Sequence, residues 1–530
     1  GLDAASERGD DAVGGEDAEH GAGEGGGDLG ADGLGAVGDG VTDDYAALQG
    51  YANVCGYIGS PFRLTDTAES YAISAKIQLK VTRDLDATDS TPASDFHFTD
   101  NLPFNVTGLG KAKLLATASM TAMLEIIYDN GADLDIAPFY SDVTGIEFDG
   151  AGLATAAVYC NYAMHLNASN NRIHGVERGF EFLGYGVGRI ERNTIRAKYG
   201  IYMPDGGGDC NISRNDFYAG ANNGACVYMS HYAGDTRIAD NVFTNEEAYT
   251  GVAGVDIAAP GASVISGESR HVTIRGNEFA AFSVAIRMTG TSTTYRNIFQ
   301  ETITDNHVNG IGGSHPGKFL QATDCTGLHV YSNFMNHRDL GDAPDWAISL
   351  TRCERCLISN NTIDAYQDEA ILLVDCIDTV VQGNRIDNCG KSSASLAIID
   401  ISGSASRRNL ISNNRFRQSS ASYAQIGVKE GTGVDETTGS LNVFDSVATP
   451  YSFIGASSIG TYFSGVTMAM QGDSTGFTFA PTTYNTTATA GPSIIARRSR
   501  GAAASPAAVQ SGDRLGFYGF AGQYDTTSGN

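Results

Sequence analysis

The sequence has few prolines, few basic residues, a single tryptophan and no long apolar run, and each shortage excludes a class of protein. Proline accounts for 12 of 530 residues, which excludes collagen-like and proline-rich chains. Lys and Arg number 34 against 61 Asp and Glu, so the net charge is -27 at pH 7. Binding of nucleic-acid phosphates needs clustered basic residues, so no nucleic-acid partner is expected. No apolar run reaches the ~18 residues that span a bilayer, so no membrane insertion is expected.

The nine cysteines do not form a recognisable disulfide or metal pattern. Their number is odd and their spacing irregular, unlike a disulfide framework. Cys353 and Cys356 form one CxxC, but no second pair completes the four converging ligands that structural zinc needs. We therefore expect small buried apolar side chains, with no metal and no cofactor.

The middle of the chain repeats a short unit in which an Asn is followed, two positions later, by a bulky apolar residue. Ten units span 243 residues, and the shortest intervals are 22 residues, which suits a coil of three short strands. Asn tolerates the left-handed backbone of a sharp corner, and stacked side-chain amides can bond one another in a ladder. Alternating strands precede the corners. The pattern predicts an all-β fold, a parallel β-helix, with a ladder at Asn171, Asn193, Asn215, Asn241, Asn277, Asn306, Asn333, Asn361, Asn384 and Asn414.

Two other segments resemble known families. The run GAVGDGVTDDYAALQ at residues 35–49 resembles the opening signature of the pectate-lyase-like superfamily, which includes polygalacturonases, polysaccharide lyases and phage tailspikes. The resemblance implies a right-handed β-helix capped by a helix. We expect Asp43 and Asp44 to cap this helix, with an apolar face of Tyr45, Leu48 and Val54.

The last segment resembles one near the C-terminus of many phage tail fibre and tailspike proteins. The shared residues are Ala496, Arg497, Arg500, Gly501, Pro506, Val509, Gly512, Asp513, Leu515 and Gly516. This resemblance implies a virion tail or extracellular location and assembly as a homotrimer.

These patterns divide the chain into five parts. The first 30 residues are acidic and Gly-rich, unlike a signal peptide, and too polar to fold alone. The expected parts are a disordered tail (1–30), a cap with irregular first coils (31–165), the parallel β-helix (166–420), a β-rich region of short antiparallel strands (421–490), and the tail-fibre-like segment (491–530).

Candidate site residues lie in the turns that follow three successive Asn corners. Stacking places these turns about 5 Å apart, and the only Trp lies there beside several acids. Aromatic faces stack on sugars, and crowded carboxylates should raise one pKa and create a general acid. We expect catalysis by Asp342, Asp345, Asp368 and Glu369, and substrate binding by Trp346, Arg338, His337, Tyr366 and Lys391.

Two other interpretations stay open. The turns can be ordinary polar surface. A rival site can lie at the longest insertion, where Arg and His would serve a lyase as cation and base. Its residues are His231, Tyr232, Glu246, Glu247, Tyr249, Glu268, Arg270, His271 and Arg275.

The expected function is degradation of a bacterial or environmental surface polysaccharide, by a lyase or glycoside hydrolase of the phage tailspike or tail fibre type. The alternative is a non-catalytic glycan-binding adhesin or structural fibre of the same fold. The polygalacturonase signature residues, a GxSxG elbow and a phosphate-binding loop are all missing from the sequence. Motifs therefore do not identify the reaction.

Overall fold

The computed structural model describes most of the chain between residues 31 and 464. The described ranges are 31–58, 61–65, 70–80, 105–109, 112–127, 141–161, 166–183, 188–204, 209–230, 234–247, 249–258, 269–290, 298–309, 317–336, 346–453 and 458–464. Within them, no helix is long and apolar enough to cross a membrane.

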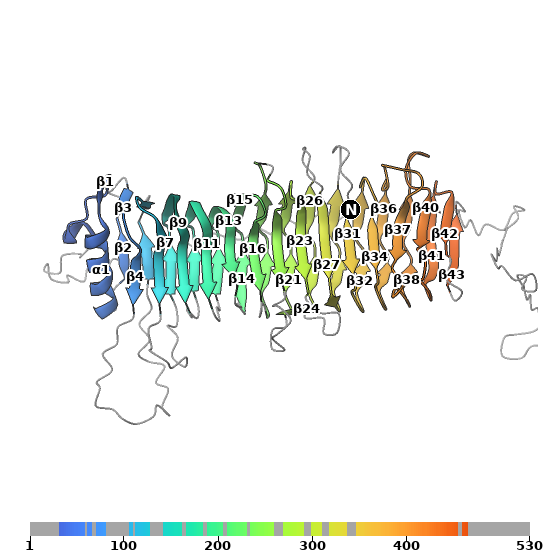
Figure 1. The fold of residues 1–530 in the computed structure, drawn as a ribbon, viewed down its shortest axis with the longest axis horizontal. Helices are drawn as coiled ribbons and strands as arrows, with labels where there is room; N and C mark the ends of the chain where they lie inside the picture. The colour runs from blue at the N-terminus through green and yellow to red at the C-terminus, as the bar shows by residue number, and fades with distance from the viewer. Residues whose placement is uncertain are drawn as a thin grey trace, which may run out of the picture. The chain divides into compact units, whose positions relative to one another are not determined.

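The strands stack coil upon coil and pair in parallel throughout the described residues (Figure 1). Each coil contributes strands to three parallel sheets. Sheet 1 precedes the Asn corner and contains β2 (Phe62–Leu64), β5 (Asn105–Gly108), β8 (Ser141–Thr144), β10 (Leu166–Ser169), β12 (Gly188–Glu191), β14 (Cys210–Ser213), β17 (Arg237–Ala239), β21 (Thr273–Arg275), β25 (Thr302–Thr304), β29 (His329–Tyr331), β32 (Leu357–Ser359), β35 (Val380–Gln382) and β38 (Leu410–Ser412).

Sheet 2 follows the corner. It contains β1 (Asp39–Asp43), β3 (Ser70–Ile73), β6 (Lys113–Ala116), β15 (Asp216–Ala219), β18 (Val242–Thr244), β22 (Glu278–Ala280), β26 (His307–Asn309), β30 (Phe334–Asn336), β33 (Thr362–Asp364), β36 (Arg385–Asp387) and β39 (Arg415–Arg417).

Sheet 3 completes each coil. It contains β4 (Ile77–Lys80), β7 (Met120–Ile127), β16 (Ala225–Ser230), β19 (Ala253–Ala258), β23 (Val284–Thr289), β27 (Lys318–Thr323), β31 (Ile348–Thr351), β34 (Ile371–Val374), β37 (Ala397–Ser402), β40 (Ile426–Glu430) and β42 (Thr449–Ser452).

Some strands run through two sheets, and a short fourth sheet lies between sheets 3 and 1. The strands β9 (Glu147–Asn161), β11 (Arg172–Leu183) and β13 (Thr194–Met203) join sheets 2 and 3. The strands β41 (Thr438–Asp445) and β43 (Ile459–Ser464) join sheets 1 and 2. The fourth sheet contains β20 (Ser269–Arg270), β24 (Ile298–Phe299) and β28 (Cys325–Thr326).

A short 3-10 helix, η1 (Ala31–Leu34), and the helix α1 (Tyr45–Ile58) cover the N-terminal end of the stack (Figure 1). Asp43 Oδ1 accepts a hydrogen bond from the backbone N–H of Tyr45, as expected of a capping residue, whereas the Asp44 carboxylate, expected to cap the same helix, accepts from the backbone N–H groups of Val37 and Gly38 instead. The amide of Gln49 bonds both backbone groups of Gln78 in β4, at 2.8 and 2.9 Å, and so replaces a missing strand. Leu48 is buried as expected, but Val54 is exposed, because the buried face turns through Tyr51 and Cys55 instead.

A continuous ladder of buried Asn side chains joins the coils. Each Asn Nδ2–H donates to the Oδ1 of the next Asn at 2.9–3.0 Å, and also to a backbone carbonyl of the preceding coil. The same Oδ1 accepts the backbone N–H of the preceding Asn. All ten predicted positions belong to the ladder, and Asn442 adds an eleventh.

The left-handed residue at each corner is the one before the ladder Asn, which corrects the conformational reason given for the pattern. Asn170, Arg192, Arg214 and Asp240 have φ between 56° and 58°. The ladder Asn is needed for its side-chain amide, which has both donors and an acceptor to offer inside the coil. Its backbone conformation is not the constraint.

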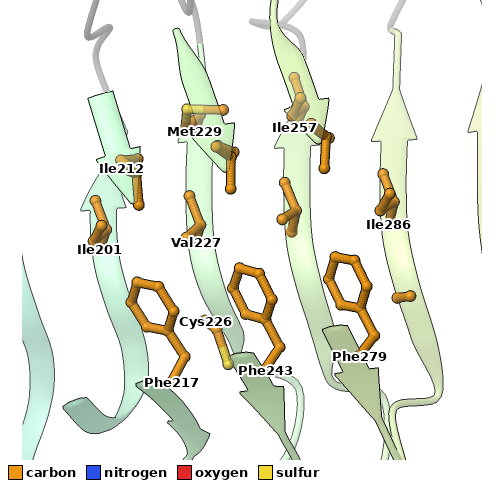
Figure 2. Packing of buried hydrophobic residues seen from close by; sticks show 14 of the residues in the cluster. Ile201, Ile212, Phe217, Cys226, Val227, Met229, Phe243, Ile257, Phe279 and Ile286 are labelled. Atoms are coloured by element: carbon orange, nitrogen blue, oxygen red, sulfur yellow. The ribbon is translucent and has the colours of Figure 1, made fainter. Parts of the chain in front are cut away.

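Aromatic and aliphatic rows fill the interior beside the ladder (Figure 2). Phe217, Phe243 and Phe279 stack on successive coils with ring centroids 5.0 and 4.7 Å apart. Each is the apolar residue two positions after a ladder Asn, so the predicted inward direction is confirmed. All nine cysteines are buried, as expected for small apolar side chains, and none of them is in a disulfide.

The coils continue beyond residue 421, where the sequence predicted short antiparallel strands. The strand β40 pairs in parallel with β37 and β42, and β41 pairs in parallel with β38, β39 and β43. Asn442 and the buried Phe444 repeat the Asn unit there. The regions 1–30, 465–490 and 491–530 lie outside the described residues.

Replacing an interior ladder residue should destabilise the fold strongly. Asn277→Ala removes four side-chain hydrogen bonds. Their buried donor and acceptor groups on Asn241, Asn306 and Ile238 then lack these hydrogen bonds. We expect a loss of about 3 kcal/mol or more in the free energy of unfolding, measured by chemical denaturation. Asn53→Ala, at an exposed helix position, is the control and should cost less than about 0.5 kcal/mol. Equal effects of the two changes would contradict the ladder's role.

Candidate functional site

The outward surface of sheet 3 carries one row of side chains in strict register, most of them half-exposed and two of them, Glu181 and Ser349, buried. In β16 and β19 the central strand residues are buried except for one outward position, Tyr228 or Asp256. We call the aligned positions the outer row. From coil to coil they are Tyr159, Glu181, Tyr202, Tyr228, Asp256, Arg287, Gln321, Ser349, Leu372, Asp400 and Lys429.

Trp346 lies beside this row, at the start of the strand in its coil. The ammonium of Lys318, one coil earlier, lies 4.1 Å from the centroid of the indole ring. The indole Nε1–H is buried and has no acceptor among the described residues. The ring is half-buried and held by a cation on one face, which positions it rigidly at the surface.

Glu369 follows Trp346 by one coil. The two residues hold equivalent positions in successive coils. Each lies two residues before a member of the register pair Ile348 and Ile371. Burial raises the pKa of Glu369 above its ordinary value, and the charges of Asp400 and Asp368 raise it further. The expectation of a raised pKa among these carboxylates is therefore confirmed for Glu369, although burial contributes more than repulsion.

Asp400 supplies the second carboxylate, and the sequence analysis did not select it. It lies in the outer row on the next coil, where Lys429 Nζ is 3.2 Å from its Oδ2. Each is the polar residue at the outward position of a mostly apolar strand, in AIIDIS and IGVKE. That signal is visible in the sequence, but only the register shows that the two side chains meet.

Asp368 and Lys391 belong to two neighbouring turns that bond each other. Asp368 Oδ1 accepts from the Ser392 hydroxyl at 2.8 Å, and its backbone carbonyl accepts from Gly390 N–H at 2.7 Å. Lys391 is half-exposed on the adjacent turn. These contacts fix the backbone that carries Glu369.

Tyr366 is not on this surface. Its side chain is fully buried, and its hydroxyl donates to the carbonyl of Gly317 at 3.2 Å. The turn after Asn361 folds back into the core at this position, so Tyr366 packs the interior instead of meeting a substrate. His337, Arg338, Asp342 and Asp345 lie outside the described residues.

The rival site is dispersed where the structure describes it. Glu246 and Glu247 are exposed and form ion pairs with Arg196 at 3.3 and 3.1 Å. His271 lies elsewhere, on the short fourth sheet's side, within 2.9 Å of Gln300 and 3.3 Å of Asp235. His231, Tyr232 and Glu268 are outside the described residues.

A surface groove of about 620 Å³ lies on sheet 1, away from these residues. It has no aromatic side chain and only one carboxylate, Asp142, so it offers neither a stacking surface nor an acid pair. Its lining residues are Pro61, Arg63, Asn105, Thr107, Leu109, Asp142, Thr144, Asn167 and Ser169.

The chain matches two family profiles and several solved structures. Residues 156–333 match the right handed beta helix region, and residues 340–432 match the periplasmic copper-binding protein NosD. No curated protein sequence gives a significant match.

Three of the similar structures show the range of proteins that share this fold. The mannuronan C-5 epimerase AlgE6 A-module of Azotobacter vinelandii is 13% identical, with 83% of this chain and 100% of that chain covered and a TM-score of 0.39. Tailspike protein 3 of bacteriophage CBA120 is 12% identical, with 82% and 61% covered and a TM-score of 0.45. PfbA, a surface adhesin of Streptococcus pneumoniae, is 13% identical, with 68% and 90% covered and a TM-score of 0.45.

The segment that matches NosD does not fit a copper site in its described residues. No group of three or more His, Cys, Asp or Glu side chains is arranged there to hold a metal ion. Cys353, Cys356 and Cys376 are buried in the core. The β-helix fold is shared with carbohydrate-active enzymes, tailspikes and adhesins. This chain is a right-handed β-helix protein, structurally similar to phage tailspikes and alginate epimerases.

Proposed function

We propose that the chain binds and cleaves a bacterial or environmental surface polysaccharide on the outward surface of sheet 3. The observation that carries this proposal is the pair Glu369 and Asp400 beside Trp346. Burial raises the pKa of Glu369 above its ordinary value, while Asp400 forms an ion pair with Lys429, whose Nζ lies 3.2 Å from Asp400 Oδ2. Such a difference between neighbouring carboxyl groups is what a glycoside hydrolase needs.

The proposed roles follow from the protonation of each group. Glu369 donates its proton to the glycosidic oxygen as the bond to the anomeric carbon breaks. Asp400 stabilises the positive charge that develops on the sugar, either by attacking the anomeric carbon or by taking a proton from the attacking water. Trp346 provides an apolar ring face for a neighbouring sugar. A carboxylate pair supports a hydrolase more than a lyase, which needs a cation at a uronate carboxylate.

We further propose a tailspike or tail fibre type of assembly, a homotrimer on a virion tail or in an extracellular setting. The support is the resemblance of residues 491–530 and of the capping run at residues 35–49. Light scattering of the full chain tests the trimer.

Substitution of the two carboxylates should abolish turnover without abolishing binding. On a polysaccharide identified from a panel of capsules, O-antigens and uronate polymers, Glu369→Gln and Asp400→Asn should lower kcat by about 10²–10⁴-fold. Asp368→Asn should lower it less, and Trp346→Ala should weaken binding by about 1–3 kcal/mol. Glu278→Gln, an exposed acid on sheet 2, is the matched control.

The product identifies the reaction class. New reducing ends without ultraviolet absorbance support the hydrolase, whereas an absorbing unsaturated product requires a lyase. Binding without any product would replace the enzyme with the adhesin. Full activity of both carboxylate variants would remove Glu369 and Asp400 from catalysis.

The raised pKa of Glu369 also predicts a pH dependence of both stability and rate. The folded protein holds the Glu369 proton more tightly than the unfolded chain, whose value is near 4.5. Above the raised pKa the buried charge destabilises the fold, so Glu369→Gln should be more stable than wild type at pH 7. This difference should vanish as pH falls below 4.5, and the wild-type rate should fall as pH rises through the raised pKa. Parallel denaturation curves from pH 4 to 8 check the first effect.

A further inference from the structure

Two outer-row tyrosines, Tyr202 and Tyr228, form an aromatic cluster with the neighbouring Tyr199, and the coil of Tyr228 lies four coils before that of Trp346. Tyr202 and Tyr228 are register neighbours on β13 and β16, with ring centroids 5.2 Å apart and nearly parallel planes. Tyr199 lies 4.9 Å from Tyr202 and 5.8 Å from Tyr228. All three are half-exposed, so a rigid aromatic surface with phenol hydroxyls faces outward.

An acid and a cation border the cluster at its N-terminal side. The guanidinium of Arg178 lies 4.3 Å from the Tyr202 ring centroid and donates a hydrogen bond to Glu181. Glu181 is buried to 6% exposure, and this burial raises its pKa. Arg178 Nε is buried without an acceptor in the described part of the chain. A buried donor without a protein acceptor is uncommon in folded proteins.

A second acid and cation border the cluster on the other side. Asp256 follows Tyr228 in the outer row, burial raises its pKa, and Arg287 lies 3.1 Å from its Oδ2. Lys198, beside Tyr199, lies 3.6 Å from Glu177. The charged residues named around the cluster thus form three ion pairs, each of an acid with a base.

The fold does not require tyrosine at these positions. The same register position holds Gln321, Ser349 and Leu372 in later coils, on strands with the same parallel pairing. The three half-buried phenol rings beside two carboxyl groups are therefore specific to these coils and are not imposed by the fold. Tyrosine gives a large amphipathic contact area for little conformational entropy, which suits recognition of a sugar ring.

We propose that Tyr199, Tyr202 and Tyr228, with Glu181 and Asp256, form a second saccharide-binding site that takes uncharged sugar units. The internally paired charges leave no cation to neutralise a uronate, so neutral hexopyranoses fit better than a polyuronate. The inference rests on the proposed function in taking the same polysaccharide as its ligand. Four coil steps separate β16 from β31, about 19 Å, so one chain along the outer row can reach both sites.

The test replaces the tyrosines with a residue that the fold already accepts at this address. Tyr202→Leu/Tyr228→Leu copies the outer-row residue Leu372, so the coil should form normally. Tyr218→Leu is the matched control, because Tyr218 is a half-exposed tyrosine of the same coil, on sheet 2, with Arg196 5.2 Å from its ring. All variants are made in the full chain carrying Glu369→Gln, and circular dichroism and thermal melting check folding.

Binding is measured by calorimetry with a mannan, a galactan, a glucan, alginate and polygalacturonate, and with the polysaccharide identified in the cleavage panel. The double variant should bind the preferred neutral polymer about tenfold more weakly or worse, whereas the Tyr218 variant should match its parent. In the Glu369→Gln chain, cleavage of oligosaccharides too short to span 19 Å should be equally low with or without the two tyrosines. In the chain that keeps Glu369, the Tyr202→Leu/Tyr228→Leu change should leave the cleavage of these short oligosaccharides unaffected.

The outcomes separate this site from the proposed catalysis. Unchanged binding by the folded double variant would overturn the tyrosine site, whatever the carboxylate variants do. Weaker binding by the double variant together with full activity of Glu369→Gln would keep the site and reject the proposed catalytic pair. Tighter binding of polyuronates than of neutral polymers would overturn the assigned sugar class.

Discussion

The structure depends on one interaction, the hydrogen bonding of a buried Asn side chain to the coil on each side of it. A buried amide that lacked these partners would cost about 1–3 kcal/mol, so each coil is stable only in register with the next. Asn277 illustrates this, because its amide bonds Asn241, Asn306 and Ile238 at once. The ladder thus converts a sequence repeat into a fixed alignment of every residue that follows the corner.

That alignment produces the functional surface. Coils differ in length, from 22 residues between Asn171 and Asn193 to 36 between Asn241 and Asn277, yet the outer-row positions remain paired across them. Residues distant in sequence therefore meet at spacings of about 4.8 Å. The pair Tyr202 and Tyr228 arises in this way, and so does the ion pair of Asp400 and Lys429. In a solenoid, an outward-facing residue can be replaced without disturbing the core. Substitutions in the outer row can therefore change binding or catalysis while the stability of the fold is kept.

The sequence was sufficient to predict the ladder and the inward direction of residues such as Phe217, because both follow from a local spacing. It did not predict Asn442 as a further rung, because the pattern was expected to stop near residue 421, although Asn442 and Phe444 repeat the same spacing. Tyr366 was misplaced because a turn after the corner was assumed to face solvent. Asp400 was missed because its place one coil beyond Glu369, paired with Leu372, is a property of the register, and no local pattern reveals it.

The most direct test of this account is a crystal structure of the Glu369→Gln protein with an oligosaccharide of its substrate. The account predicts sugar density along the outer row, in contact with Trp346 and with one glycosidic oxygen beside residue 369 and Asp400. Density confined to the groove on sheet 1, near Asn105 and Asp142, would contradict it.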